Sequence, residues 1–254
     1  MYIDSHAHLG DEVLFAQHKE VLERAFSVGI DAVVNICTNS KTLKRGMELH
    51  HSIQPKILLA AATTPHDVES EGESFFSEVE EAALQKKLAA IGETGLDYHY
   101  EYSPRQLQKK FLIQYFQLAI KMNLPLIFHC RDAFEDLFLL ADTEYKRPTA
   151  LLHCFTGALE EARQVLDRGW SISFSGIITF KKSEALREVV RYVPMDRMFI
   201  ETDAPFLAPQ SKRGLLNEPS FVVETAKVIS EIKNISIESV AESTAKNARA
   251  FFAF

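Results

Sequence analysis

Short apolar runs rich in β-branched residues alternate along the chain with longer amphipathic segments. The short runs have the length and composition of buried strands, and the longer segments repeat apolar residues at the spacing of a helix. Strands are predicted at residues 2–7, 31–36, 57–62, 88–93, 125–129, 150–153, 170–175 and 198–202. Helices are predicted near residues 15–28, 41–51, 73–87, 104–121, 132–142, 158–168, 182–191, 219–232 and 236–252. The chain is therefore expected to alternate strand and helix from one end to the other.

Strand and helix in repeated alternation indicate a parallel sheet, because parallel strands need a crossover connection between them. Eight such units suggest closure into a (β/α)8 TIM barrel of the α/β class. The alternative is a doubly wound open sheet, whose site would lie at a switch point between strands. The length of 254 residues is close to that of a single TIM barrel, although it also allows two smaller domains. We predict one barrel domain spanning residues 1–254.

The charge balance limits what the protein can bind. Lys and Arg number 28 against 35 Asp and Glu, which gives a formal net charge of −7. This balance argues against broad, nonspecific coating of nucleic acid, which needs many cationic side chains on phosphates. A nuclease whose site meets only one strand end is not excluded, since bound cations can supply the positive charge there.

Neither export nor membrane insertion is expected. The N-terminus lacks the basic and apolar regions of a signal peptide. The longest apolar stretches, at 56–62 and 137–141, are too short to span a bilayer. An odd number of cysteines, Cys37, Cys130 and Cys154, suggests reduced thiols. We therefore expect a cytoplasmic protein, and a monomer, because nothing in the sequence marks an interface.

Side chains that ligate metals stand at the C-terminal ends of the predicted strands. They are His6 and His8 on the first strand, Glu93 on the fourth, His129 on the fifth, His153 on the sixth and Asp203 on the eighth. In a barrel these ends converge on one face, where TIM-barrel active sites are found. Residues spread from position 6 to position 203 are therefore expected to meet in space.

The spacing of the two histidines in the first strand has a geometric reason. Side chains alternate across a strand, so His6 and His8 point the same way and can reach one cation. Such a pair alone is weak evidence, but four histidines with two carboxylates form a ligand set that suits Zn, Mn or Mg. Burying so many ionisable groups as ordinary interior residues would cost much free energy without a cation.

A bridging Glu93 would let this set hold two divalent metal ions. His6, His8 and Asp203 would complete one site, and His129 and His153 the other. Two cations about 4 Å apart form the clamp that is used in phosphoryl hydrolysis. The pattern therefore favours hydrolysis of a phosphodiester.

Further side chains near the same strand ends are expected to support the site or to face a substrate. Glu201 lies two residues before Asp203, so it points to the same side of the strand and can orient a ligand. His66 and His99 follow the third and fourth strands and are expected to line the mouth of the barrel. The candidates for stacking on bases are Tyr98, Tyr100, Tyr102 and Phe206, with packing of the loops as the alternative.

Several segments of the chain resemble the signature motifs of the TatD family of metal-dependent hydrolases. They are MYIDSHAHL at 1–9, IGETGLDYHY at 91–100, LPLIFHCRDA at 124–133, LHCFTG at 152–157, ETDAPFLAP at 201–209 and NEP at 217–219. Their order and spacing also agree, so the resemblance covers essentially the whole chain. It implies a TIM barrel, divalent metal ions and hydrolysis of phosphodiester bonds in DNA.

The resemblance also implies roles for single residues. Carried over by motif, the metal ligands are the same six residues that the strand ends select. Arg131 matches an arginine of the family and is expected to face the substrate phosphate, with a structural ion pair as the alternative. Arg213 and Asn217 lie in the motif region after the last strand and are expected to bind substrate or to support the site.

Two departures from the family pattern bear on nucleic-acid contacts. Thr64 stands where the family commonly has the first histidine of His-Pro-His. Leu215 and Leu216 stand where the family commonly has two basic residues. If those positions touch phosphates in relatives, this chain should bind nucleic acid less tightly and with a shallower salt dependence.

The predicted activity is that of a metal-dependent deoxyribonuclease acting on single-stranded DNA ends, with 3'-5' exonuclease-like action. Asp203 is expected to accept the proton of the attacking water, and Glu93 to hold the metals. The alternatives are an esterase, lactonase or D-aminoacyl-tRNA deacylase on the same barrel, and a metal-binding interaction protein without turnover. The native metal, exonuclease against endonuclease action, the polarity of cleavage, and DNA against RNA as substrate are left open by the sequence.

Overall fold

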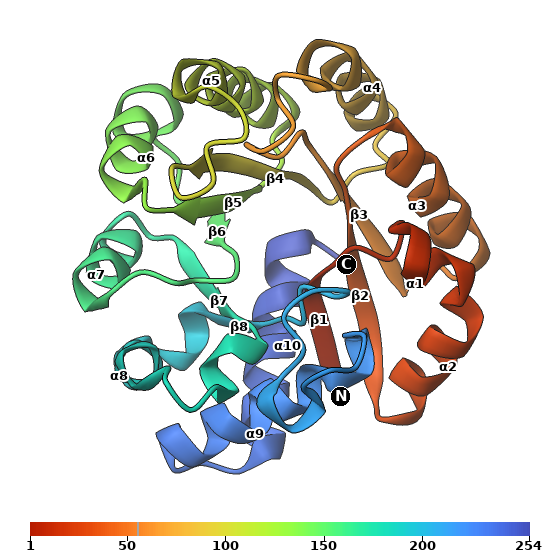
Figure 1. Ribbon diagram of the computed structural model, residues 1–254, viewed down its shortest axis with the longest axis vertical. Helices are drawn as coiled ribbons and strands as arrows, with labels where there is room; N and C mark the ends of the chain where they lie inside the picture. The colour runs from red at the N-terminus through yellow and green to blue at the C-terminus, as the bar shows by residue number, and fades with distance from the viewer. Residues whose placement is uncertain (55) are drawn as a thin grey trace.

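A computed structural model describes residues 1–54 and 56–254 of the chain. Eight parallel strands follow one another around the molecule in chain order (Figure 1). Their bounds are β1 (Tyr2–Ala7), β2 (Ile30–Cys37), β3 (Ile57–Ala61), β4 (Ala90–Asp97), β5 (Leu126–Arg131), β6 (Ala150–Leu152), β7 (Ser171–Phe174) and β8 (Met198–Ile200). The predicted (β/α)8 TIM barrel is confirmed.

The helices form a ring around the strands (Figure 1). The α-helices are α1 (Glu12–Ala16), α2 (His18–Ser27), α3 (Ser40–Ser52), α4 (Gly72–Leu84), α5 (Arg105–Met122), α6 (Phe134–Leu140), α7 (Leu159–Asp167), α8 (Glu184–Tyr192), α9 (Val222–Lys233) and α10 (Ile237–Phe252). A π-helical turn, η1 (Ala141–Tyr145), extends α6, and 3-10 turns occur at η2 (Gly176–Thr179), η3 (Met195–Arg197), η4 (Gln210–Lys212) and η5 (Pro219–Phe221). Across residues 1–54 and 56–254, no helix combines the length and the apolar character that crossing a membrane requires.

The barrel closes between its last and first strands. Asp203 donates its backbone N–H to the carbonyl of His6 at 2.9 Å, and His8 donates to the carbonyl of Ala204 at 2.7 Å. These bonds, with the bridge between Ala7 and Ala204, continue the ladder past the end of β8. The first and last strands are therefore neighbours, which excludes the alternative of an open sheet.

Alternate residues of the strands supply two apolar cores. On β2, Val34 and Ile36 belong to a cluster made almost entirely of strand residues, which fills the barrel. Val33 and Cys37 belong to the larger cluster that the surrounding helices cover. Phe252 of α10 packs into the barrel cluster, so α10 covers the N-terminal end of the barrel. The C-terminal end is left for polar side chains.

The strand predicted at 88–93 is wrong at both ends. The structure begins β4 at Ala90 and continues it to Asp97, so Glu93 stands inside the strand and not at its end. Gly92 and Gly95 have φ values of 151° and 155°, and the pairing with β5 shifts register between Ile91 and Thr94. This irregular stretch turns Glu93 toward the other ligands while the strand continues.

One predicted helix is divided in the structure. The segment predicted near 15–28 consists of α1 and α2, because Gln17 leaves the helical conformation with φ −127°. The first helix begins where the Asp11 side chain caps the backbone N–H of Val13 at 2.9 Å. This break lies outside the predicted ligand set and does not alter it.

Gly95 has no room for a side chain. A Cβ at this position would lie 1.8 Å from the carbonyl oxygen of His129 on β5. We expect Gly95→Ala to lower the free energy of unfolding by about 3 kcal/mol or more, because β4 and β5 would have to separate. Chemical denaturation measures the change.

The matched control is Gly29→Ala. Gly29 has φ 90° but no heavy atom within 4 Å of the added Cβ, so this variant should lose only about 1 kcal/mol of unfolding free energy. Equal losses would mean that backbone conformation alone requires the glycine.

Candidate metal centre

Glu93 lies between two pairs of histidines. Its Oε2 atom lies 3.4 Å from His6 Nε2 and 3.8 Å from His8 Nε2. Its Oε1 atom lies 2.9 Å from both His129 Nδ1 and His153 Nε2. Each oxygen of one carboxylate therefore faces its own pair of imidazole nitrogens, which is the arrangement that a bridging ligand needs.

Asp203 completes the group on the β1 side. Its Oδ1 atom lies 3.3 Å from His8 Nε2 and 3.6 Å from His6 Nε2. Its backbone is left-handed, with φ 58°, and its N–H is bonded to β1. The turn after β8 therefore presents the carboxylate directly to the two histidines.

The protonation of His6 and of Glu93 suits metal binding. Both nitrogens of the fully buried His6 lack a hydrogen-bond partner among the described residues, although two carboxylates lie within 4 Å. Burial lowers the pKa of His6 and favours the neutral imidazole, which is the ligating form. Burial alone would raise the pKa of Glu93, but His153, His129 and His6 hold it well below its usual range. The clusters of nitrogen and oxygen atoms can hold divalent metal ions.

Two carboxylates stand behind the histidines. Glu201 is buried and accepts a hydrogen bond from His153 Nδ1 at 3.3 Å, as the sequence predicted for a residue that orients a ligand. Asp97 does the same for His129, whose Nε2 donates to Asp97 Oδ2 at 2.8 Å. These bonds fix the ring orientations and leave His129 Nδ1 and His153 Nε2 aimed at Glu93.

Sequence reasoning missed Asp97. Burial alone would raise its pKa, but the hydrogen bond from His129 and the backbone N–H of Tyr100 lower it to about 2. Alternation of side chains along a strand could have identified Asp97, since positions 93, 95 and 97 of one strand share a face. That signal depends on β4 reaching Asp97, and the predicted strand ended at Glu93.

We expect Asp97→Asn to weaken metal binding about 10-fold to 100-fold, the usual effect of losing a carboxylate behind a ligating histidine. The amide oxygen of the substituted side chain can still accept the backbone N–H groups of His99 and Tyr100, which now bond Asp97 Oδ1 at 3.0 and 2.9 Å. The fold should therefore survive. Calorimetric titration with Mn²⁺ or Zn²⁺ measures both the affinity and the number of ions bound.

The matched control is Asp132→Asn, which alters the exposed pair between Asp132 and His99, 3.1 Å apart on the same mouth. It should leave metal affinity unchanged. His66 Nε2 also lies 3.5 Å from Asp97 Oδ2, so His66, Asp97 and His129 could themselves hold an ion. Loss of one bound ion in Asp97→Asn, at unchanged affinity for the rest, would make Asp97 a ligand and overturn its positioning role.

The metal-ligand cluster opens into a cleft of about 1070 Å³ at the C-terminal end of the barrel. Of the further predicted residues, Arg131, His66 and His99 line this cleft, and so does Thr64. The Thr64 hydroxyl donates to Asp67 Oδ2 at 2.9 Å. His66 and His99 therefore line the mouth of the barrel, as predicted.

Arg213 and Asn217 are not among the described residues that line the cleft. Arg213 is exposed, and its guanidinium lies 4.8 Å from the ring centre of Phe180. Asn217 is buried, and its amide donates to the carbonyls of Thr202 and Phe206 at 2.8 and 2.5 Å. Asn217 thus holds the loop that presents Asp203, and it supports the site from outside the cleft.

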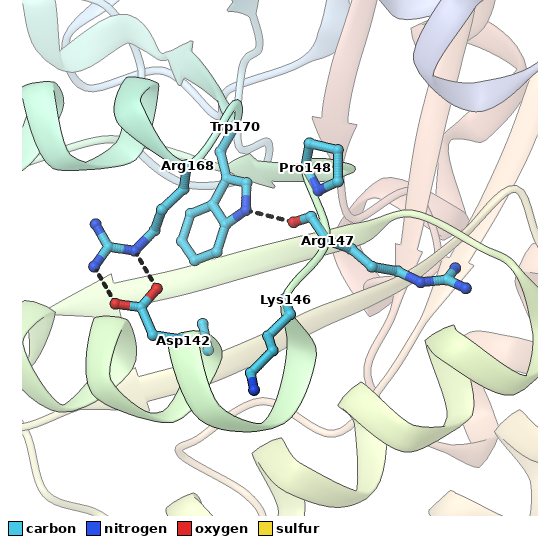
Figure 2. Close-up of a pocket in the computed structure, with 7 residues that line it drawn as sticks. Asp142, Lys146, Arg147, Pro148, Arg168 and Trp170 are labelled. Atoms are coloured by element: carbon cyan, nitrogen blue, oxygen red, sulfur yellow. Dashed lines mark hydrogen bonds and ion pairs between the residues drawn. The ribbon is translucent and has the colours of Figure 1, made fainter.

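A smaller cavity of about 220 Å³ lies near the N-terminal ends of β6 and β7 (Figure 2). Two of its cationic side chains, those of Arg147 and Arg168, already have partners. Arg168 forms two hydrogen bonds to Asp142, at 2.8 and 2.6 Å, and Arg147 donates to Asn123 Oδ1 at 3.0 Å. The cavity is remote from the predicted metal ligands. None of the described residues that line it belongs to a cluster that could hold a metal ion.

Comparison with known proteins agrees with this geometry. The model of the TatD-related DNase family matches residues 3–253. The chain belongs to the TatD family. It is 38% identical over 253 residues to the uncharacterized metal-dependent hydrolase YabD of Bacillus subtilis, and the match covers 99% of both chains. This TatD-family protein is therefore a metal-dependent hydrolase.

One relative carries a more specific name. The 3'-5' ssDNA/RNA exonuclease TatD of Pantoea ananatis is 30% identical over 245 residues, and the match covers 94% of both chains. Among solved structures, the TatD homologue YjjV of Escherichia coli has a TM-score of 0.93 and 23% identity, with 100% of this chain and 98% of that chain covered. That structure supports the barrel fold.

Proposed function

We propose that the protein is a divalent-metal-dependent phosphodiesterase that removes nucleotides from the 3' end of single-stranded DNA. The observation that carries this proposal is the position of Glu93, which turns one oxygen to each of two histidine pairs. Such a ligand set suits two cations that clamp the attacking and leaving oxygens of a phosphodiester. The name of the Pantoea ananatis relative supports a single-stranded nucleic acid as substrate and the 3' end as the point of attack.

In this proposal the six ligands divide into two sets that share Glu93. His6, His8 and Asp203 hold one cation, and His129 and His153 hold the other. Divalent cations in these positions supply a Lewis acid for a phosphoryl oxygen and lower the pKa of water. The nitrogen and oxygen donors suit Zn, Mn or Mg.

Asp203 serves as the general base. Its side chain lines the cleft and is 13% exposed, so water can reach it. It takes the proton as the water oxygen bonds to phosphorus, and the phosphorus–oxygen bond to the leaving nucleotide breaks. Glu201 and Asp97 keep the histidine rings in place during this step.

Arg131 is proposed to bind the substrate phosphate. It lies two residues after His129 on β5 and lines the cleft. Its guanidinium lies 4.8 Å from the ring centre of Tyr100, and neither a hydrogen bond nor an ion pair to a described residue occupies it. A planar guanidinium in that position matches the geometry of a phosphate.

A substrate panel tests the proposal. Purified protein loaded with Mn²⁺, Mg²⁺ or Zn²⁺ is assayed on single-stranded DNA, single-stranded RNA, a carboxylic ester, a lactone and D-aminoacyl-tRNA. We expect the highest kcat/KM on DNA. Turnover of an ester or of aminoacyl-tRNA without turnover of any phosphodiester would overturn the proposal, since the same ligand set could direct water to a carbonyl carbon.

A further inference from the structure

Two tyrosines form an exposed stack at the mouth of the barrel. The rings of Tyr100 and Tyr102, in the loop after β4, are 5.2 Å apart and nearly parallel, at 14°. Tyr100 is 47% exposed and Tyr102 67% exposed, and both line the cleft. Their exposed faces are therefore accessible to a ligand in the cleft.

The stack stands next to the metal-ligand cluster. The His66 ring lies 5.8 Å from Tyr100, 5.4 Å from Tyr102 and 5.3 Å from His129. One imidazole ring therefore separates the tyrosines from a predicted ligand. A flat group on the tyrosines would therefore share the cleft with a group bound to the ligands.

A second exposed ring lies across the mouth. Phe206, in the loop after β8, is 54% exposed and contacts the ring of His8 edge-on at 5.8 Å. In an eight-stranded barrel with this strand order, β4 and β8 are on opposite sides. The cleft therefore offers aromatic surface on both sides of the candidate metal centre.

We propose that Tyr100 and Tyr102 form a stacking platform for the base of an unpaired nucleotide whose phosphate lies at the candidate metal centre. This inference rests on the proposed nuclease function and names the feature of the substrate that the mouth recognises. Stacking accepts every base, because each has a flat π-face, and it requires that the base has left a duplex. The platform thus selects single-stranded ends without selecting sequence.

The low number of cationic side chains is consistent with a binding mode that depends on stacking. The chain carries a formal net charge of −7. On the loop after β8, Leu215 and Leu216 are 61% and 40% exposed at positions where the TatD-family pattern commonly has two basic residues. With few cationic contacts, affinity should depend only weakly on salt. The aromatic rings are then expected to supply much of the binding free energy.

The test compares Tyr102→Ala with two controls on two substrates. Tyr102→Phe keeps the ring, and Tyr192→Ala removes a tyrosine that is 45% exposed at the end of α8, away from the mouth. One substrate is a single-stranded oligodeoxynucleotide. The other is the same strand with tetrahydrofuran in place of the two 3'-terminal nucleosides, so the phosphodiesters are kept and the bases are absent.

We expect Tyr102→Ala to raise KM for the normal strand roughly 5-fold to 150-fold, the range that loss of base–aromatic stacking gives, with little change in kcat. KM for the abasic strand should already be high in the wild type and should not change in Tyr102→Ala. Tyr102→Phe and Tyr192→Ala should behave as the wild type on both strands.

Two results would overturn the platform in different ways. If the wild type cleaves the normal strand and Tyr102→Ala has an unchanged KM, or an equal rise in KM on both strands, the platform is wrong and the nuclease function stands. If the wild type, with metal bound, cleaves neither strand, the proposed function is wrong and the platform falls with it.

Discussion

Glu93→Gln should abolish most of the metal-dependent activity, with a fall in kcat/KM of about 10³-fold or more, equivalent to ~4 kcal/mol. Glutamine keeps the size of the side chain but offers one neutral oxygen where Glu93 turns a charged oxygen to each histidine pair. The cations would lose their shared ligand and the negative charge that holds them together. We expect the number of tightly bound ions to fall as well.

Turnover of the panel substrates and calorimetric metal titration measure the two effects of Glu93→Gln. Thermal unfolding provides a check on folding, because metal should raise the melting temperature of the wild type but not of the variant. Glu201→Gln is the graded comparison, since the Glu201 carboxylate hydrogen-bonds His153 and no other side chain among the described residues, and its metal affinity should fall about 10-fold to 100-fold. Full metal binding and activity in Glu93→Gln would remove Glu93 from the metal centre.

Asp203→Asn should lower kcat by about 10³-fold, ~4 kcal/mol, because an amide cannot take the proton of the attacking water. The fold should tolerate the change, since asparagine is among the residues that best accept the left-handed conformation recorded at this position, φ 58°. The backbone N–H that bonds His6 is also unchanged. The loss should therefore appear in kcat more than in stability.

Single-turnover rates with metal at saturation separate the two roles of Asp203. A base role predicts a low rate with both ions bound, whereas a purely ligating role predicts recovery of the rate as metal concentration rises. Asn217→Ala provides a comparison outside the cleft, because it loosens the loop that presents Asp203. Full turnover of Asp203→Asn with metal bound would remove Asp203 from the base role.

The sequence predicted the barrel well because its strands contain buried apolar runs of distinct composition, such as Leu126 to Phe128 in β5. It failed where local geometry differs from regular strand or helix. Glycines at 92 and 95 break the apolar pattern of β4, so the pattern stopped at Glu93 although pairing with β5 continues to Asp97. Gln17 interrupts a segment whose apolar spacing is helical throughout.

The candidate site was predictable for the same reason as the fold. Strand ends meet on one face of a barrel, so His6 and Asp203 could be placed together although 197 positions separate them. Contacts that depend on loop conformation could not be predicted in this way. The inward turn of Asn217 and the stacking of Tyr100 on Tyr102 follow from backbone angles in the loops, which periodicity does not encode.

The most direct test is the cleavage of single-stranded DNA labelled at its 5' end, with Mg²⁺ or Mn²⁺ and with EDTA. The double variant Glu93→Ala, Asp203→Ala is assayed beside the wild type. We predict a ladder that shortens from the 3' end with metal, and no cleavage with EDTA or in the double variant. Intact DNA with metal shown to be bound, or a ladder that persists in the double variant, would contradict a two-metal nuclease built on these residues.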